Sequence, residues 1–284
     1  MKFYLINLDR SPDRLSWIQR QTTQLGIEVT RISAIDGSKL AEDVVLQWTR
    51  AVHPLFGIGP NEIACFLSHR EAWKRIATGS DPWGFVAEDD IHISSSLPEF
   101  LESHQWIPAD ADLVKAETVN KRVWLSRKNM TSHAEHQVCE LRSLHLGAAG
   151  VFFSKQCAQK LVDATVNLCA SPDQIVFNQS LPPARPLKIY QILPALVVQD
   201  WALDQKSNQT QFASLLLQER NAYHVSKHNH HQSLAEYAWH KLSSPVRKVS
   251  RRSLEAAASL LGTHRVIKID FDTTRDSSAA WINQ

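Results

Sequence analysis

Apolar and polar positions at the start of the chain change from the period of a strand to that of a helix and back. Residues 3–8 form a short, mostly apolar run, the pattern of a buried parallel strand. Residues 11–13 (SPD) then supply an N-cap, a proline for the first turn and an acid for the helix dipole. They predict a helix that ends at Gly26, with a second strand over residues 27–32. This βαβ opening predicts a parallel sheet with a right-handed crossover.

The alternation of strand and helix patterns continues to about residue 200. Apolar residues recur at helical spacing from residue 60 until Gly79, and residues 83–87 form a strand that runs directly into three acids. Further strands are expected over residues 113–116, 123–126, 151–153 and 189–193, and further helices over residues 155–165 and 173–180. This order predicts an α/β, three-layer domain over residues 1–206.

The pattern changes beyond Lys206, where the sequence becomes polar and then basic. Residues 221–252 contain five of the thirteen histidines and six Lys or Arg residues, and Glu236 is the only acid among them. A short amphipathic helix over residues 254–261 and a last strand over residues 266–271 complete the expected elements. We interpret residues 207–284 as a helical, basic extension of the main domain.

The basic part of this extension has two interpretations. Between residues 237 and 252, Lys and Arg are interleaved with apolar and aromatic residues, which suits peripheral contact with an anionic membrane. A solvated basic helix face is the equally common alternative. The histidines between residues 224 and 231 have no carboxylate companion at metal-ligand spacing, which favours a solvated loop over a metal site.

The overall composition excludes several classes of protein. With 43% hydrophobic residues, the 284-residue chain can form a packed core, which excludes global disorder. A net charge of +2 does not indicate a nucleic-acid binder. Four scattered cysteines without a CxxC motif indicate buried thiols in a reducing compartment. Because neither a secretory signal nor a membrane-spanning stretch is visible, we expect a cytoplasmic protein, soluble or peripheral at a membrane.

The most informative motif is Glu88, Asp89 and Asp90, called the acidic triplet below, which follows the strand over residues 83–87. Adjacent carboxylates repel one another, and a divalent cation among them offsets that repulsion. Residues i and i+2 point to the same side, at the sheet edge where α/β proteins bind ligands. Carboxylate oxygens suit Mg²⁺ or Mn²⁺, ions that also hold diphosphate oxygens. The alternative is an acidic loop that caps a helix.

The first strand-to-helix turn carries a second candidate site. Arg10 and Arg14 suit phosphate, whereas Asn7 and Asp9 suit a base or a ribose. The turn lacks a glycine-rich fingerprint, so a Rossmann dinucleotide site is not expected. Residues 36–37 (DG), after the second strand, indicate a turn first and a ribose ligand second.

Four sequence blocks resemble a known family in their order and spacing. They are residues 4–14 (YLINLDRSPDR), 34–37 (AIDG), 62–70 (EIACFLSHR) and 85–91 (FVAEDDI), with weaker similarity in residues 113–115 (LVK), 147–150 (GAAG), 171–173 (SPD) and 193–199 (LPALVVQ). Together they resemble glycosyltransferase family 25, which includes bacterial lipopolysaccharide and lipooligosaccharide galactosyltransferases. The resemblance covers about residues 2–200.

The resemblance implies the A-type glycosyltransferase fold (GT-A), a single Rossmann-like nucleotide-sugar domain. It also implies a UDP-sugar donor, inversion at the anomeric carbon, and Mn²⁺ or Mg²⁺ as the cofactor. The acidic triplet would take the place of the Asp-x-Asp metal motif, with Asp90 and Glu88 as metal ligands. The residues expected to bind the donor are Asn7, Arg10, Asp36, Gly37, His69 and Glu88. Taken alone, a histidine on a helix such as His69 is more often a satisfied core residue.

An inverting transferase also needs a base that accepts the proton of the acceptor hydroxyl. Asp173 is the candidate, because it follows Ser171 and Pro172 at a position that resembles the Pro-x-Asp of the family. Stabilisation of a helix dipole is the alternative. The remaining metal ligand stays open: Gln199 lies late enough in the chain, but an amide is a poor ligand for Mn²⁺, and His92 and His145 are the other candidates.

The expected function is therefore transfer of a sugar, with galactose as the first candidate, from a UDP-sugar to a lipooligosaccharide or lipopolysaccharide core acceptor. A non-catalytic relative that binds nucleotide-sugar or glycan is the alternative. A metal phosphohydrolase that uses Asp89 and Asp90 is a third possibility, although the sequence has no phosphatase nucleophile motif.

Overall fold

The predicted strand–helix–strand unit opens the fold. β1 (Lys2–Asn7) and β2 (Val29–Ser33) pair in parallel and are joined by α1 (Pro12–Gln24). Gly26, two residues after the helix, has a φ of 65°, a left-handed conformation that glycine adopts without steric penalty. Ser11 is the N-cap residue as predicted, but its side chain makes no capping hydrogen bond. The local sequence signals therefore mark this helix correctly.

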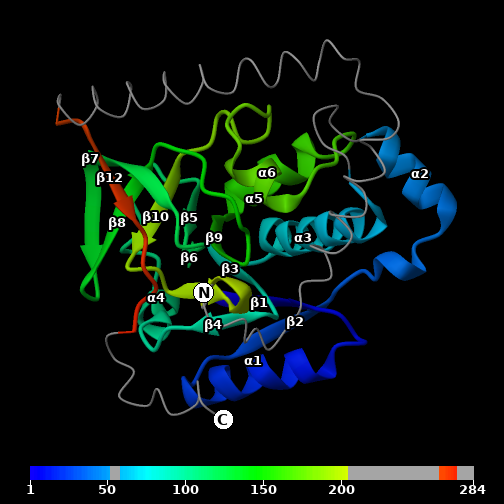
Figure 1. Ribbon diagram of the computed structural model, residues 1–284, viewed down its shortest axis with the longest axis horizontal. Helices are drawn as coiled ribbons and strands as arrows, with labels where there is room; N and C mark the ends of the chain where they lie inside the picture. Colours follow the sequence, from blue (N-terminus) through cyan, green and yellow to red (C-terminus); the bar gives the residue numbers. More distant parts are fainter. Residues whose placement is uncertain (52–57, 204–261, 274–284) are drawn as a thin grey trace.

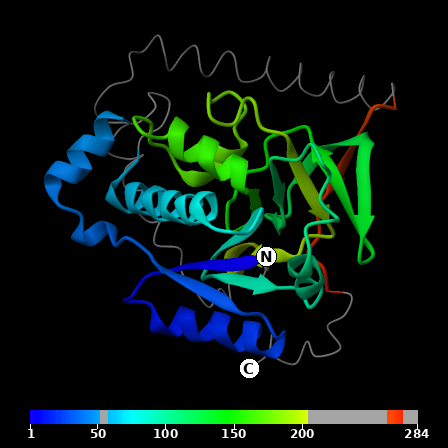
Figure 2. The same ribbon diagram turned by 180° about the vertical axis from the view of Figure 1, so that it is seen from behind.

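The computed structural model describes residues 1–51, 58–203 and 262–273, which Figures 1 and 2 show from opposite sides. The other helices of these ranges are α2 (Glu42–Arg50), α3 (Pro60–Thr78), α4 (Leu97–Glu102), α5 (Lys155–Ala164), α6 (Pro172–Phe177) and α7 (Asp200–Leu203), with a short 3-10 helix η1 (Gly37–Lys39). The other strands are β3 (Trp83–Glu88), β4 (Ile91–Ile93), β5 (Leu113–Lys115), β6 (Glu117–Thr118), β7 (Arg122–His133), β8 (His136–Leu141), β9 (Gly150–Ser154), β10 (Ile189–Leu193), β11 (Val197–Gln199) and β12 (His264–Lys268).

A large mixed sheet forms the centre of the described structure, in the strand order β12-β7-β8-β10-β5-β9-β3-β1-β2. The predicted parallel pairing holds for β2, β1 and β3. Beyond them the predicted parallel sheet is mixed, because β9 runs antiparallel to both β3 and β5, whereas β5 and β10 pair in parallel. Parallel neighbours need a crossover connection, whereas residues 116–149, between β5 and β9, contain the β7–β8 hairpin and no helix. The chain therefore leaves β5 and enters β9 at the same end of the two strands, which makes them antiparallel.

Helices cover both faces of this sheet, α1 on one side and α3 with α5 on the other (Figures 1 and 2). Successive side chains of β1 point to opposite faces of the sheet. Tyr4 and Ile6 belong to the core that contains α3 and α5, whereas Phe3 and Leu5 belong to the core that contains α1. All four side chains are buried, as expected for a strand with both faces covered. The predicted three-layer α/β architecture is confirmed.

The hydrophobic pattern does not predict the second sheet, in which β11 lies between β4 and β6. Each of these strands has only two or three residues, too few for a period of two to be recognised. β11 is antiparallel to β4, and Gln199 at its end pairs with Ile91, directly after the acidic triplet. The small sheet therefore brings a residue more than a hundred positions away to the end of β3.

Part of the carboxyl-terminal region joins the central sheet. β12, close to the last strand predicted over residues 266–271, pairs antiparallel with β7 at the sheet edge. The predicted boundary after residue 206, the histidine-rich and basic residues, and the helix expected over residues 254–261 lie outside the described residues. Within the described ranges, no helix combines the length and the apolar character needed to cross a membrane.

A buried ion pair joins β5 to β6 beside the site described below. Lys115 Nζ donates a hydrogen bond to Glu117 Oε2 at 3.0 Å, and neither side chain is exposed. The ammonium group also donates to two carbonyl groups of residues 146–149, and Ala149 N donates to Glu117. Burial lowers the pKa of Lys115 and raises the pKa of Glu117, and the charge of each partner opposes these shifts. The pair therefore holds residues 146–149 against the sheet.

Removing one partner of this pair should destabilise the fold strongly. Lys115→Met leaves the Glu117 carboxylate buried without its cation, and we expect the free energy of unfolding to fall by about 3–5 kcal/mol. Lys160→Met is the matched control, because Lys160 is 54% exposed and its partner Asp112 keeps a hydrogen bond from Lys188 N, so the loss should stay below about 1 kcal/mol. Urea denaturation of the two variants measures both values. Equal losses would contradict a structural role for the buried pair.

Candidate active site

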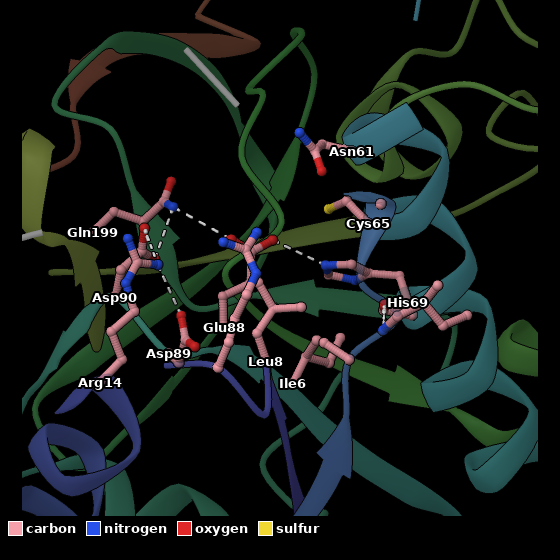
Figure 3. A pocket seen from close by; sticks show the side chains of 15 residues that line it. Ile6, Leu8, Arg14, Asn61, Cys65, His69, Glu88, Asp89, Asp90 and Gln199 are labelled. Atoms are coloured by element: carbon pink, nitrogen blue, oxygen red, sulfur yellow. Dashed lines mark hydrogen bonds and ion pairs between the residues drawn. The ribbon is translucent and has the colours of Figure 1, made fainter. Parts of the chain in front are cut away.

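An open cavity lies at the carboxyl ends of β1, β2 and β3, beside α3 (Figure 3). β1 lies between β2 and β3, and helices leave these strands on opposite faces of the sheet. The carboxyl ends of such neighbouring strands form a topological switch point, where open α/β sheets bind ligands. The cavity is lined by Ile6, Leu8, Arg10, Arg14, Ala34, Ile35, Gly37, Asn61, Cys65, Ser68, His69, Glu88, Asp89, Asp90 and Gln199.

Two carboxylates of the acidic triplet converge within this cavity. Gln199 Nε2 donates to Glu88 Oε2 at 3.4 Å and to Asp90 Oδ1 at 3.2 Å (Figure 3). The side chains of residues 88 and 90 therefore lie on one side of the strand end, as their i, i+2 spacing predicts. Their oxygens are ligands of the kind that Mg²⁺ and Mn²⁺ prefer, so Glu88 and Asp90 fit a divalent cation.

The middle residue of the triplet has separate partners. Asp89 Oδ1 accepts a hydrogen bond from Arg14 Nη1 at 3.0 Å, and its Oδ2 accepts one from Asn7 Nδ2 at 2.7 Å. Arg14 Nη1 also lies 3.8 Å from Asp90 Oδ2. One arginine from α1 therefore offsets part of the negative charge of two neighbouring carboxylates.

The surroundings of Asp90 disfavour its ionised form. Burial, and then repulsion from Glu88, raise the pKa of Asp90 to about 7, although Arg14 opposes the shift. Burial also raises the pKa of Asp89, against the effect of Arg14 and Asn7. A bound cation would stabilise the ionised form of both carboxylates, because it reverses the sign of the local field.

Asn7 does not line the cavity but contacts Asp89, which does. Its amide nitrogen donates to Asp89 and to the carbonyl of Ser11, and its Oδ1 accepts from Arg31 Nε at 2.9 Å. The side chain is buried and its polar atoms already have protein partners. The contacts therefore favour a role in orienting Asp89 over the direct donor contact that the sequence analysis expects.

Arg10, Asp36 and Gly37 lie together on the other side of the cavity. Arg10 Nε is 3.0 Å from Asp36 Oδ2, and hydrogen bonds from Ser38 hold the pKa of Asp36 below its usual range. A Cβ atom on Gly37 would lie 2.6 Å from the Cα of Asn61, so only glycine allows η1 to pack this closely against the start of α3. Arg10 and Gly37 line the cavity, whereas Asp36 acts on it through Arg10.

His69 connects α3 to the acidic triplet. Its Nε2 donates to Glu88 Oε1 at 2.9 Å, and the imidazole is only 1% exposed. Cys65 lines the cavity one helical turn before it (Figure 3). Cys65 is not among the site residues predicted from the sequence. Its i, i+4 spacing to His69 nevertheless indicates that both residues share one face of the helix.

Asp173 begins α6 and does not line the cavity. Its Oδ1 accepts from Ser171 Oγ at 2.7 Å and from Gln174 N at 2.8 Å, and its Oδ2 accepts from Gly147 N at 3.4 Å. Residues 147–149 connect it to the triplet, because Glu88 N donates to the carbonyl of Ala149. Asp173 therefore lies beyond the segment that borders the end of β3.

The three candidates for a further metal ligand differ in position. Gln199 lines the cavity and contacts both carboxylates. His92 Nε2 lies 2.9 Å from Asp200 Oδ1, and His145 Nδ1 lies 2.9 Å from Gln191 Oε1; neither histidine lines the cavity. Burial, and then Lys115, lower the pKa of His145 to about 3. Of the three, the geometry favours Gln199 as the residue next to a cation.

Comparisons with known proteins agree with the sequence blocks. The family model described as "Glycosyltransferase family 25 (LPS biosynthesis protein)" matches residues 1–176. The lipooligosaccharide biosynthesis protein lic2B of Haemophilus influenzae is 25% identical over 70% of this chain and 76% of its own length. The lacto-N-neotetraose biosynthesis glycosyltransferase LgtB of Neisseria meningitidis serogroup A is 25% identical over 88% of this chain and 92% of its own length.

A solved structure of a glycosyltransferase involved in glycosylation of the major capsid of PBCV-1 aligns with 70% of this chain and 94% of its own. Its sequence identity is 9% and its TM-score is 0.37, a similarity too distant to bear on function. The family match covers more than half of the chain and includes the strand ends, helix α3 and the acidic triplet that form the cavity. The chain belongs to glycosyltransferase family 25.

Proposed function

We propose that this protein is an inverting, metal-dependent glycosyltransferase of the GT-A type. It transfers a hexose, with galactose as the first candidate, from a UDP-sugar to a sugar of a lipooligosaccharide or lipopolysaccharide core. Family membership and the names of the two bacterial relatives support the reaction class and the acceptor class. The observation that carries the proposal is the convergence of Glu88 and Asp90 on one point of the cavity.

A divalent cation is the partner that best explains this convergence. Asp90 is buried beside Glu88, and the amide of Gln199 lies within hydrogen-bond distance of both carboxylates. Glu88 and Asp90 would hold Mn²⁺ or Mg²⁺, and a bound cation would neutralise charge on the departing diphosphate. His69 orients Glu88 by the hydrogen bond to its other oxygen.

Two arginines suit the phosphates of the donor. Arg10 and Arg14 both line the cavity and approach it from the β1–α1 turn and the first turn of α1. Guanidinium groups bind phosphate through paired hydrogen bonds. Gly37 lines the cavity near Arg10, and its missing side chain lets η1 pack against the start of α3, which places this turn in the wall where a ribose or a base would bind. This arrangement supports binding of a nucleoside diphosphate at this position.

The proposed mechanism is a single in-line displacement at the anomeric carbon. The oxygen of the acceptor hydroxyl bonds to C1 while Asp173 accepts the proton of that hydroxyl. The bond from C1 to the diphosphate breaks in the same step. Among the described residues, Asp173 Oδ2 accepts one long hydrogen bond, from Gly147 N at 3.4 Å, which leaves capacity to accept a proton. The acceptor would then approach from the side of residues 147–149, opposite the arginines.

Metal removal tests the central part of the proposal. Transfer from UDP-sugars to a panel of lactose- and heptose-terminated acceptors should stop in EDTA and return with Mn²⁺. Asp90→Asn keeps the shape of the side chain but removes its charge, and should lower kcat/KM by more than about 100-fold. Asp163→Asn, an exposed acid on α5, is the matched control and should retain wild-type activity.

The same assay separates the alternatives. UDP binding without transfer to any acceptor of the panel would indicate a non-catalytic relative. Phosphate release without an acceptor would indicate a phosphohydrolase. Full activity in EDTA would contradict metal dependence.

Metal-free protein should lose stability as the pH rises. The pKa of Asp90 is about 7 in the folded protein against 3.8 for an accessible aspartate, so between these values only the folded chain retains the proton. Its free energy of unfolding should therefore fall from about pH 4 to about pH 7 and then level off. The Tm in EDTA at pH 5 and pH 8 measures this change. An equal change in Asp90→Asn would show that another group is responsible.

The role of Asp173 is tested by a conservative change. Asp173→Asn keeps the size of the side chain but removes the base, so kcat should fall by about 100-fold or more while the KM for the donor stays nearly constant. Initial rates at varied UDP-sugar concentration give both parameters, with Asp163→Asn again as the control. A near-wild-type kcat with an unchanged Tm would exclude Asp173 as the base.

A further inference from the structure

A second set of ligand atoms lies in the cavity, beside the carboxylates of the acidic triplet. Cys65 and His69 are one turn apart on α3, and both side chains face the cavity on the side of Glu88 (Figure 3). The Cys65 Sγ, a ring nitrogen of His69 and a carboxylate oxygen of Glu88 all lie within 4.8 Å of one another. A thiol, an imidazole and a carboxylate therefore meet at one place.

This donor set differs chemically from the pair formed by Glu88 and Asp90. Two carboxylates suit hard ions such as Mn²⁺ and Mg²⁺, whereas thiolate and imidazole ligands select Zn²⁺. Tetrahedral zinc with bonds of about 2.0–2.3 Å needs ligand atoms about 3.3–3.6 Å apart. The present spacing of up to 4.8 Å requires a closure of about 1 Å, which side-chain rotation of Cys65 or Glu88 can supply.

The helix supports two of the three ligands. α3 has 19 residues, and its residues Ile63, Phe66 and Trp73 are buried in the core on other sides of the helix. His69 is itself buried, and its Nε2 already points to Glu88 at 2.9 Å. Asn61, one turn before Cys65, lines the same cavity, and the open side leaves room for water as a fourth ligand.

We propose that Cys65, His69 and Glu88 form a Zn²⁺ site that shares Glu88 with the hard-cation site. On binding, the Cys65 thiol releases its proton to the solvent as the zinc–sulfur bond forms. His69 Nε2 gives up to the solvent the proton that it donates to Glu88, and Nδ1 takes one from the solvent, so that neutral imidazole binds through Nε2. Glu88 then turns from Gln199 towards the zinc. Zinc bound in this way would remove Glu88 from the hard-cation site and so inhibit transfer. The zinc site itself is independent of the proposed reaction, whereas this inhibition rests on the proposed function.

Co²⁺ provides a direct spectroscopic test of the thiolate ligand. Full-length protein is treated with EDTA, desalted under reducing conditions and titrated with Co²⁺. The wild type should develop a thiolate-to-cobalt charge-transfer band that one equivalent of Zn²⁺ removes. Cys65→Ser and Cys65→Ala should lack the band, whereas Cys157→Ala should keep it, because that cysteine is buried outside the cavity.

Absence of the band from the wild type would overturn the site. Persistence of the band in both Cys65 variants would also overturn it, provided that both variants have a wild-type Tm. A second measurement reads zinc affinity by competition with a chromophoric chelator, and loss of the thiolate should weaken it by about 10-fold or more. Unchanged zinc affinity in both Cys65 variants would also overturn the proposal.

The functional consequence is measured separately, in the Mn²⁺-activated transfer assay. Zn²⁺ should inhibit the wild type and Cys157→Ala at a concentration about 10-fold lower than Cys65→Ala. Equal inhibition would contradict the shared use of Glu88. If the protein shows no transfer under any condition, the proposed function fails, but the cobalt band still reports whether the zinc site exists.

Discussion

Electrostatic repulsion at the end of β3 is the constraint on which the rest of the site depends. Three adjacent carboxylates lie where a buried strand meets a cavity, and a fold tolerates this only if each has a partner of opposite charge or a hydrogen-bond donor. Arg14 and Asn7 satisfy Asp89, whereas Glu88 and Asp90 share the amide of Gln199. Because Glu88 and Asp90 converge on one point of the cavity, this pair is also the one best placed for a cation.

Several parts of the fold serve this strand end. β1 supplies Asn7, the following turn and the first turn of α1 supply Arg10 and Arg14, α3 supplies His69, and the small sheet supplies Gln199. On the remaining side, residues 147–149 receive the Glu88 N–H and are held in turn by the buried pair of Lys115 and Glu117. The cavity is therefore bordered by segments that lie far apart in the sequence.

Sequence reasoning predicts those features that depend on local chemistry. Caps and periodicity predict α1 and α3, and carboxylates after an apolar strand predict the metal-binding edge. It does not predict the reversal of β9, the proximity of Gln199, or the inward-facing role of Asn7, because each depends on pairing between distant segments. Cys65 is an intermediate case, because its spacing to His69 is visible in the sequence, but the carboxylate that completes the cluster is not.

The account depends most directly on a cation that joins the acidic triplet to a nucleoside diphosphate. Isothermal titration of UDP into full-length protein, first in EDTA and then with saturating Mn²⁺, measures that link without an acceptor. The account predicts that UDP binds at least about 10-fold more tightly with Mn²⁺, and that Asp90→Asn removes this difference. Equal UDP affinity in EDTA and in Mn²⁺ would contradict it.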